Sequence, residues 1–184
     1  MLFRSPNYFG RGVARALLAY IVDRADALQM PLRLVSSALN LDSFSLYTRA
    51  GFVPRCLYQD VVVDVPEAGL DTPPSALASV RAARPEDVES MAALERTLCG
   101  IDRGGDYRHF VDNREGFWNV CVCEHGGQLT GFLVASRDML GPGVAQSEDG
   151  AAALIYQQLL GRPGRSTLFL VPAECASLVR QVYA

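Results

Sequence analysis

The chain contains no lysine, because all 17 of its basic residues are arginines. A Walker-type phosphate-binding loop needs a lysine beside the phosphates, so the sequence excludes that class of nucleotide-binding protein. Schiff-base chemistry and reactions with a lysine nucleophile are excluded for the same reason.

Long apolar runs and positive net charge are also missing. No apolar stretch approaches the roughly 20 residues that span a bilayer, and residues 1–4 do not resemble a signal peptide. The formal net charge of −3 argues against a nucleic-acid surface. We therefore expect a cytoplasmic protein without membrane or nucleic-acid partners. Its 184 residues, 49% of them hydrophobic, can form one domain or two small ones.

Histidine and cysteine give little support for metal or nucleophilic chemistry. The five cysteines form no C-x-x-C pair, and their odd number favours reduced, buried thiols over a disulfide framework. Cys121 and Cys123 share one face of a predicted strand, but only His109 and His125 could complete a zinc site, so we expect no metal. The sequence leaves a spatial Cys–His encounter open.

A Gly-x-Gly turn at Gly10 and Gly12 runs directly into an amphipathic helix, and this is the most informative feature present. The first turns of that helix carry no acid, whereas Arg11 and Arg15 add positive charge. A helix start offers unpaired N–H donors and about half a positive charge, and glycines allow phosphates to approach the backbone. The turn is therefore a candidate anion site, although a Gly-rich helix entry more often reflects ordinary turn chemistry.

The segments after this turn alternate between helix and strand. Apolar residues recur at helical spacing from Val13 to Leu28, and Pro31 precedes an apolar run over residues 32–35 that predicts a strand. A short helix follows, with Asn40 as its N-cap and Gly51 at its end, and then a strand over residues 55–65. A dinucleotide-binding fold would need a third glycine where Arg15 stands and an acid after the strand, so that alternative is disfavoured.

These segments resemble the C-terminal half of a GNAT-family N-acetyltransferase. In that family a (Gln/Arg)-x-x-Gly-x-(Gly/Ala) loop is followed by a helix, a strand and an Asn-x-x-(Ala/Ser)-x-x-Leu-Tyr-x-x-x-Gly-Phe helix. The second pattern is matched by Asn40, Ser43, Leu46, Tyr47, Gly51 and Phe52, and the first by Gly10 and Gly12. Asn7 stands where the family has Gln or Arg.

The resemblance implies acetyl-CoA as cosubstrate. Its pyrophosphate would contact the backbone of Phe9, Gly10, Arg11, Gly12, Val13 and Ala14. Asn40 and Ser43 would lie near the pantetheine arm or the CoA tail, and Tyr47 beside the thioester sulfur as general acid. A phenol with a pKa near 10 stays protonated at neutral pH and can donate to a departing thiolate. The alternative is that Tyr47 only packs its short helix on a sheet.

A second structured region follows a linker that we predict over residues 66–78, which are rich in proline and polar residues. A strand over residues 79–83 and a helix opening at residues 84–88 resemble the start of another GNAT module. Its helix stripe is expected at Val88, Met91, Ala92, Leu94 and Leu98, with a further short helix over residues 106–113. A hairpin should pair residues 117–123 with 128–136.

The second module has its own candidate helix start at residues 140–150. Ser147 is a good N-cap there, but Glu148 and Asp149 place negative charge where a phosphate would lie, and Pro142 removes a donor. We therefore expect poor binding of CoA at this start. The Leu-Gly-Pro-x-x-Ala pattern resembles the degenerate C-terminal module of some tandem GNAT proteins. A strand over residues 166–171 and a final helix from residue 172 should follow.

The prediction is a GNAT-like α/β protein with a mixed central sheet flanked by helices, built from two partial modules. Residues 1–65 would be the rear half of one module and residues 79–184 most of a second module that lacks its last strand. Strands and helices that precede the loop in the family are expected to be missing before Met1. The two parts could complete each other within one chain or in a homo-oligomer.

The predicted function is transfer of acetyl from acetyl-CoA to a small-molecule or peptide amine. A non-catalytic CoA-binding or protein-interaction remnant is the alternative.

Overall fold

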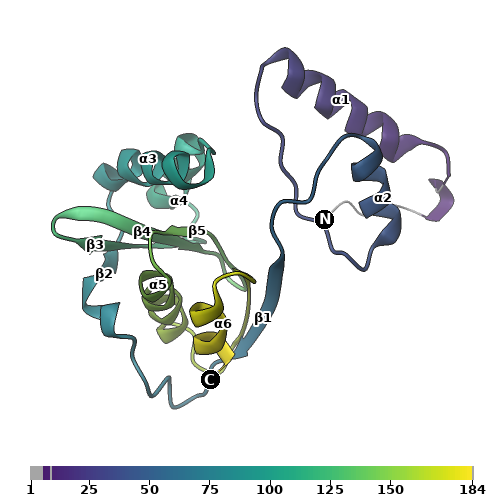
Figure 1. The fold of residues 1–184 in the computed structure, drawn as a ribbon. Coiled ribbons are helices and arrows are strands. Elements are labelled where there is room, and N and C mark those ends of the chain that lie inside the picture. The colour runs from purple at the N-terminus through teal and green to yellow at the C-terminus, as the bar shows by residue number, and fades with distance from the viewer. Residues whose placement is uncertain (1–5, 9, 184) are drawn as a thin grey trace. The chain divides into compact units, whose positions relative to one another are not determined.

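A computed structural model describes residues 6–8 and 10–183, and its contacts divide the chain into two units that meet between Arg55 and Cys56 (Figure 1). The first unit is helical. The second contains the strands and the remaining helices.

The first unit holds one short 3-10 turn, η1 (Pro6–Tyr8), and two helices, α1 (Val13–Ala27) and α2 (Leu41–Arg49). Gly12 is the N-cap of α1 with φ 76°, a left-handed conformation that favours glycine. Asn40 caps α2 as predicted, since its side-chain oxygen accepts the Ser43 backbone N–H at 3.1 Å. Gly51 follows α2 with φ 92°.

The strand predicted over residues 32–35 is wrong, because these residues form no ladder in the described chain. A strand needs a partner for its backbone N–H and C=O groups, and the described chain supplies none here. The apolar stripe of α1 is likewise uncovered. Within residues 13–27 no side chain is buried, and Leu17 and Tyr20 are 51% and 65% exposed.

The second unit is built on an antiparallel sheet in the order β2-β3-β4-β5. Its strands are β2 (Val80–Ala82), β3 (Asn119–His125), β4 (Gln128–Ala135) and β5 (Leu140–Ala145). The predicted hairpin is β3–β4, and it turns through Gly126 and Gly127, both with positive φ.

A second, two-stranded ladder pairs β1 (Tyr58–Asp64) antiparallel with β6 (Ser166–Pro172). A single parallel bridge between Met139 and Leu168 connects β6 to the residue before β5. The prediction grouped residues 55–65 with the first module, whereas in the structure β1 pairs with a strand more than 100 residues later and lies in the second unit. A ladder partner so distant in sequence has no local signature.

The segment predicted as a linker, residues 66–78, packs on the second unit. It ends in η2 (Ser75–Ser79), which contacts α5, and the Tyr156 hydroxyl donates to the Leu70 carbonyl at 2.8 Å. The segment therefore connects β1 to β2 within one unit.

Helices cover both faces of the sheet (Figure 1). α3 (Val88–Cys99), which follows η3 (Pro85–Asp87), and α4 (Gly104–Asp112) pack on one face over Met91, Tyr107 and Phe132. α5 (Glu148–Leu160) and α6 (Ala176–Tyr183) belong to the core of the other face with Leu154 and Phe169. The α3 stripe is as predicted except for Leu98, which is exposed.

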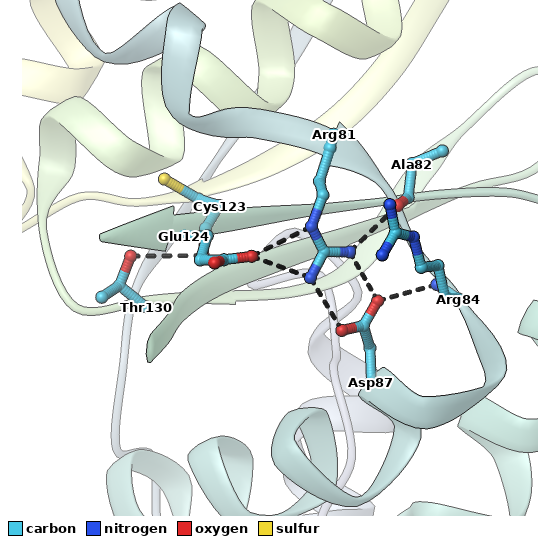
Figure 2. A network of polar contacts seen from close by, with 7 residues as sticks. All are labelled: Arg81, Ala82, Arg84, Asp87, Cys123, Glu124 and Thr130. Carbon is cyan, nitrogen blue, oxygen red and sulfur yellow. Dashed lines mark hydrogen bonds and ion pairs between the residues drawn. The ribbon is translucent and has the colours of Figure 1, made fainter. Parts of the chain in front are cut away.

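Arg81 joins β2 to β3 and η3 through a fork of ion pairs (Figure 2). Its two terminal nitrogens contact the Asp87 carboxylate at 2.7 and 2.9 Å, and its Nε contacts Glu124 at 3.0 Å. Asp87 also accepts the Arg84 backbone N–H at 2.7 Å. The guanidinium of Arg81 is the main cause that lowers the pKa of Asp87 below its ordinary value.

Candidate functional site

The start of α1 has the backbone geometry predicted for an anion site. Gly10 and Gly12 both have left-handed φ, at 73° and 76°, and a Cβ at either position would meet no atom of the described chain within 4 Å. The first turn carries no acid and Gly12 supplies no capping side chain. The Ala16 N–H donates to the Gly12 carbonyl at 2.9 Å, so the N–H groups before it have no partner inside the helix.

Arg11 lies within this turn, with its guanidinium 5.4 Å from the centre of the Tyr8 ring. A cation over an aromatic face gains roughly 0.5–1 kcal/mol at an exposed site. The Arg11 backbone N–H donates to the Tyr8 carbonyl at 3.4 Å, a long bond that closes the turn. Phe9 lies outside the described residues.

Asn40 and Ser43 contact each other through the α2 cap. The Asn40 side-chain oxygen is occupied by the Ser43 N–H, and Ser43 is buried at 6% exposure. Beside the cap is an open surface depression lined by residues 37 and 39–42. Both residues thus have a structural role in the cap, and their contact with CoA stays a prediction.

Tyr47, the predicted general acid, is half-buried on α2. Its ring meets Phe52 edge to face, with centroids 6.0 Å apart. This contact holds the ring against the chain that leaves α2. Among the described residues, no hydrogen bond or ring contact joins Tyr47 to the start of α1, so their shared role stays a prediction.

The second candidate helix start, at α5, has opposite chemistry. Ser147 is its N-cap, as predicted, and its hydroxyl accepts the Gly150 N–H at 3.1 Å. Glu148 and Asp149 lie in the first turn, and Glu148 also accepts the Leu178 backbone N–H at 2.6 Å. The helix dipole is therefore already satisfied by side chains of the protein itself.

A cavity of about 280 Å³ lies beside this start, between β5, β6, α5 and α6. Sequence reasoning missed it, because it exists where β5 and β6 are joined only by the bridge at Met139 and Leu168 within the described chain. The only local signal was the run of glycines and proline at residues 141–143.

Other polar groups are buried in the second unit. Glu95 and Tyr107 are almost fully buried and joined by a hydrogen bond of 2.5 Å, and Arg103 pairs with the same carboxylate. Burial, reinforced by Glu95, raises the pKa of Tyr107. These contacts belong to the packing of α3 against α4.

Cys121 and Cys123 are buried in the core between the sheet and α5. Burial raises the pKa of the Cys121 thiol to about 12, which keeps it protonated. Among the described residues, no three His, Cys, Asp or Glu side chains are grouped so as to hold a metal ion. In the same part of the chain, no helix is long and apolar enough to cross a membrane.

Comparison with solved structures identifies the fold. The chain is similar to a protein from Pyrococcus horikoshii provisionally assigned as an acetyltransferase, with a TM-score of 0.65 and 15% identity over 96% of this chain. It is also similar to a GCN5-related N-acetyltransferase from Anabaena variabilis, with a TM-score of 0.56 and 13% identity over 95% of this chain. The chain spans 57% and 47% of the lengths of those two proteins.

No family profile matches the sequence, and no curated protein matches it. The protein has a GNAT-like fold, a mixed α/β architecture with an antiparallel central sheet flanked by helices, as the sequence predicted.

Proposed function

We propose that the chain is the cosubstrate-binding part of an N-acetyltransferase that takes acetyl from acetyl-CoA and transfers it to an amine. One observation carries the proposal, namely the start of α1 with its two left-handed glycines, its acid-free first turn and the charges of Arg11 and Arg15. Backbone N–H groups and arginines together suit a diphosphate. The GNAT-like fold supports acyl transfer as the reaction class.

The start of α5 supports this assignment by contrast. It is capped by Ser147 and carries two acids, so a diphosphate would meet a filled cap and negative charge. Of the two helix starts, that of α1 is the one suited to CoA.

In the proposed reaction a neutral amine attacks the thioester carbonyl, so that a C–N bond forms and the C–S bond breaks. The hydroxyl of Tyr47 gives its proton to the departing thiolate, and the proton lost by the amine passes to a base. The half-buried setting of Tyr47 keeps one side of the ring packed on Phe52 and leaves part of it accessible. The acceptor is a small-molecule or peptide amine.

The alternative, a non-catalytic remnant, also rests on an observation. Asn40 is already used as a cap, and the ring of Tyr47 packs against Phe52, so both have structural reasons to be present. Binding and turnover must therefore be tested separately.

Calorimetric titration of the full chain with acetyl-CoA tests the binding step. Val13→Glu adds an acid to the first turn of α1, which suits the helix dipole and leaves the glycines untouched. We expect this variant to lose at least tenfold in affinity, whereas Ala19→Glu, with the same charge at an exposed position further along α1, binds like the unmodified chain. Equal affinities for both variants, or no binding at all, would refute the proposed site.

Tyr47→Phe tests the catalytic step. We expect this variant to bind acetyl-CoA as the unmodified chain does and to release CoA at least tenfold more slowly. The release of CoA is measured by mass spectrometry, with a panel of small amines and peptides as acceptors. Binding without any turnover, or turnover that is equal in Tyr47→Phe, would favour the structural reading of this tyrosine.

A further inference from the structure

β1 is the outer strand of its ladder, because β6 is the only strand that pairs with it in the part of the chain that the structure describes. The other side of β6 already carries the bridge between Leu168 and Met139. β1 has seven residues, which is the length of an ordinary strand. An edge strand of this length presents a row of backbone N–H and C=O groups with which a further strand can pair.

The backbone groups on the outer side of β1 belong to alternate residues. At the end of the ladder the Val65 N–H donates to the Arg165 carbonyl at 3.0 Å, so the odd-numbered residues of β1 direct their backbone groups toward β6. In an antiparallel ladder the residues between them direct these groups to the opposite side. The N–H and C=O groups of Asp60, Val62 and Asp64 therefore form an open edge.

One group of the open edge is in weak contact with α6. The Tyr183 hydroxyl donates to the Asp60 carbonyl at 3.5 Å, which is the outer limit of a hydrogen bond, and the Tyr183 side chain is 61% exposed. The contact agrees with a carbonyl that points away from β6. An N–H group of a further strand can replace this hydroxyl at a shorter distance.

The side chains on the exposed face of β1 determine which kind of strand fits. Asp60, Val62 and Asp64 share this face, whereas Val61 on the other face is buried. Val62 is 64% exposed, and it lies opposite Leu168, which is 38% exposed. Among the described residues, neither aspartate forms an ion pair. The face therefore has an apolar centre between two negative charges.

A second copy of β1 is a poor partner for the open edge. In each register that pairs the outward-directed residues of two β1 strands, an aspartate of one copy lies opposite or diagonal to an aspartate of the other, because Asp60 and Asp64 are only four residues apart. Like charges that face each other across two strands destabilise the pair. The aspartates thus oppose self-association but favour a strand of opposite charge.

We propose that the open edge of β1 binds an extended segment of a partner protein as an additional strand. The segment carries an apolar residue, with an arginine or lysine two positions before it and another two positions after it. Backbone hydrogen bonds hold the segment on the edge, its apolar residue covers Val62, and its two cations pair with Asp60 and Asp64.

The geometry at the aspartates is compatible with such pairs. The Asp64 carboxylate accepts the Ser166 hydroxyl, and a carboxylate has about four acceptor positions, so it can still accept a cationic donor. The inference uses residues of the second unit only, and it does not depend on the proposed site at α1.

A capped peptide with the sequence Thr-Arg-Thr-Val-Thr-Arg-Thr tests the charge preference by calorimetry on the full chain. We expect it to bind at least tenfold more tightly than the same peptide with glutamate in place of both arginines. Hydrogen exchange followed by NMR should show slower exchange of the Asp60, Val62 and Asp64 amides in the complex. Equal affinities for the two peptides, or no binding at millimolar concentration, would overturn the proposal.

Two N-methylated forms of the arginine peptide test the backbone pairing. One form is methylated at the arginines and the valine, and the other at the threonines. Only alternate N–H groups of a bound strand face β1, so one form should bind at least tenfold more weakly than the other. Equal binding of the two forms would mean that charge alone attracts the peptide, and this result would also refute an added strand.

The double variant Asp60→Asn, Asp64→Asn tests the location, because it removes both charges and keeps the shape of the side chains. It should bind the arginine and glutamate peptides alike. Asp106→Asn is the matched control, since Asp106 is an exposed aspartate on α4, and it should keep the preference for arginine. A preference retained in the double variant, with a native circular dichroism spectrum, would place the peptide elsewhere and overturn the assignment. Failure of the site at α1 would appear instead in acetyl-CoA binding by Val13→Glu, so the two proposals can fail separately.

Discussion

Replacement of Arg81 by methionine should destabilise the second unit in a pH-dependent way. Arg81 holds β2 against η3 and β3 through Asp87 and Glu124 (Figure 2). Methionine keeps much of the apolar length of the side chain and removes every one of these ion pairs. The Asp87 carboxylate then keeps only the Arg84 N–H among the contacts described for it.

The magnitude follows from the exposure of each partner. Hydrogen bonds to charged groups contribute about 1.5–3 kcal/mol when buried, whereas exposed ion pairs contribute roughly 0–1 kcal/mol. The Asp87 side chain is 10% exposed and that of Glu124 is 38% exposed, so the Asp87 pair dominates. We expect Arg81→Met to lower the free energy of unfolding at pH 7 by about 2–3 kcal/mol.

The sign of the pH dependence follows from the lowered pKa of Asp87. Its folded pKa lies below the ordinary value of 3.8, so the ion pair stabilises the folded state fully above that value. The contribution is lost as the pH falls through the folded pKa. The difference between the unmodified chain and Arg81→Met should therefore be largest near neutrality and shrink in acid.

Urea unfolding followed by circular dichroism at a series of pH values measures this difference. Arg96→Met is the matched control, because Arg96 pairs with Asp102 with both side chains more than half exposed, and its effect on stability should be far smaller. A loss in Arg81→Met that is as small as in Arg96→Met, or that stays constant from pH 7 to pH 3, would refute the reasoning.

Four further substitutions, at three positions, test the packing and helix capping of the second unit by urea unfolding. Tyr107→Phe removes the hydroxyl that donates to the buried Glu95 and should cost about 1–3 kcal/mol; a neutral result would mean that water replaces the hydroxyl. Met91→Ala, at a fully buried position, should cost about 2–5 kcal/mol, and a cost below 1 kcal/mol would contradict close packing there. Ser147→Ala should lower the free energy of unfolding by about 1 kcal/mol, because the side-chain cap of α5 is lost. Ser147→Asp should lower it much less, because aspartate also caps helices. Similar losses in both variants would argue against the cap.

Local signals in the sequence were sufficient for most helices. The caps at Asn40 and Ser147 are confirmed because capping depends on residues three positions apart. The hairpin around Gly126 and Gly127 is confirmed for the same reason, since its turn chemistry lies within the turn.

The pairing of strands far apart in the sequence could not be predicted from such local signals. The apolar run at residues 32–35 has the composition of a strand, but no strand of the described chain pairs with it. The strand at β1 was recognised, whereas its pairing with β6 was not, so the domain boundary was placed after it. Strand pairing is decided by surface that only the folded chain brings together.

The two candidate sites differ in the same way, because one depends on local sequence and the other on long-range packing. The glycines before α1 are visible in the sequence because a left-handed φ restricts the residue type. The cavity beside Glu148 was not visible, because its walls come from five elements, β4, β5, α5, β6 and α6, spread over residues 132–178.

The two helix starts satisfy their backbone N–H groups in different ways. Every α-helix begins with unpaired N–H groups that need an acceptor. At α5 the protein supplies an acceptor and negative charge itself, through Ser147 and Glu148. At α1 the first turn has no acid and its N-cap no capping side chain, so the need for an acceptor can be met by a ligand. A diphosphate should therefore prefer the start of α1 to that of α5.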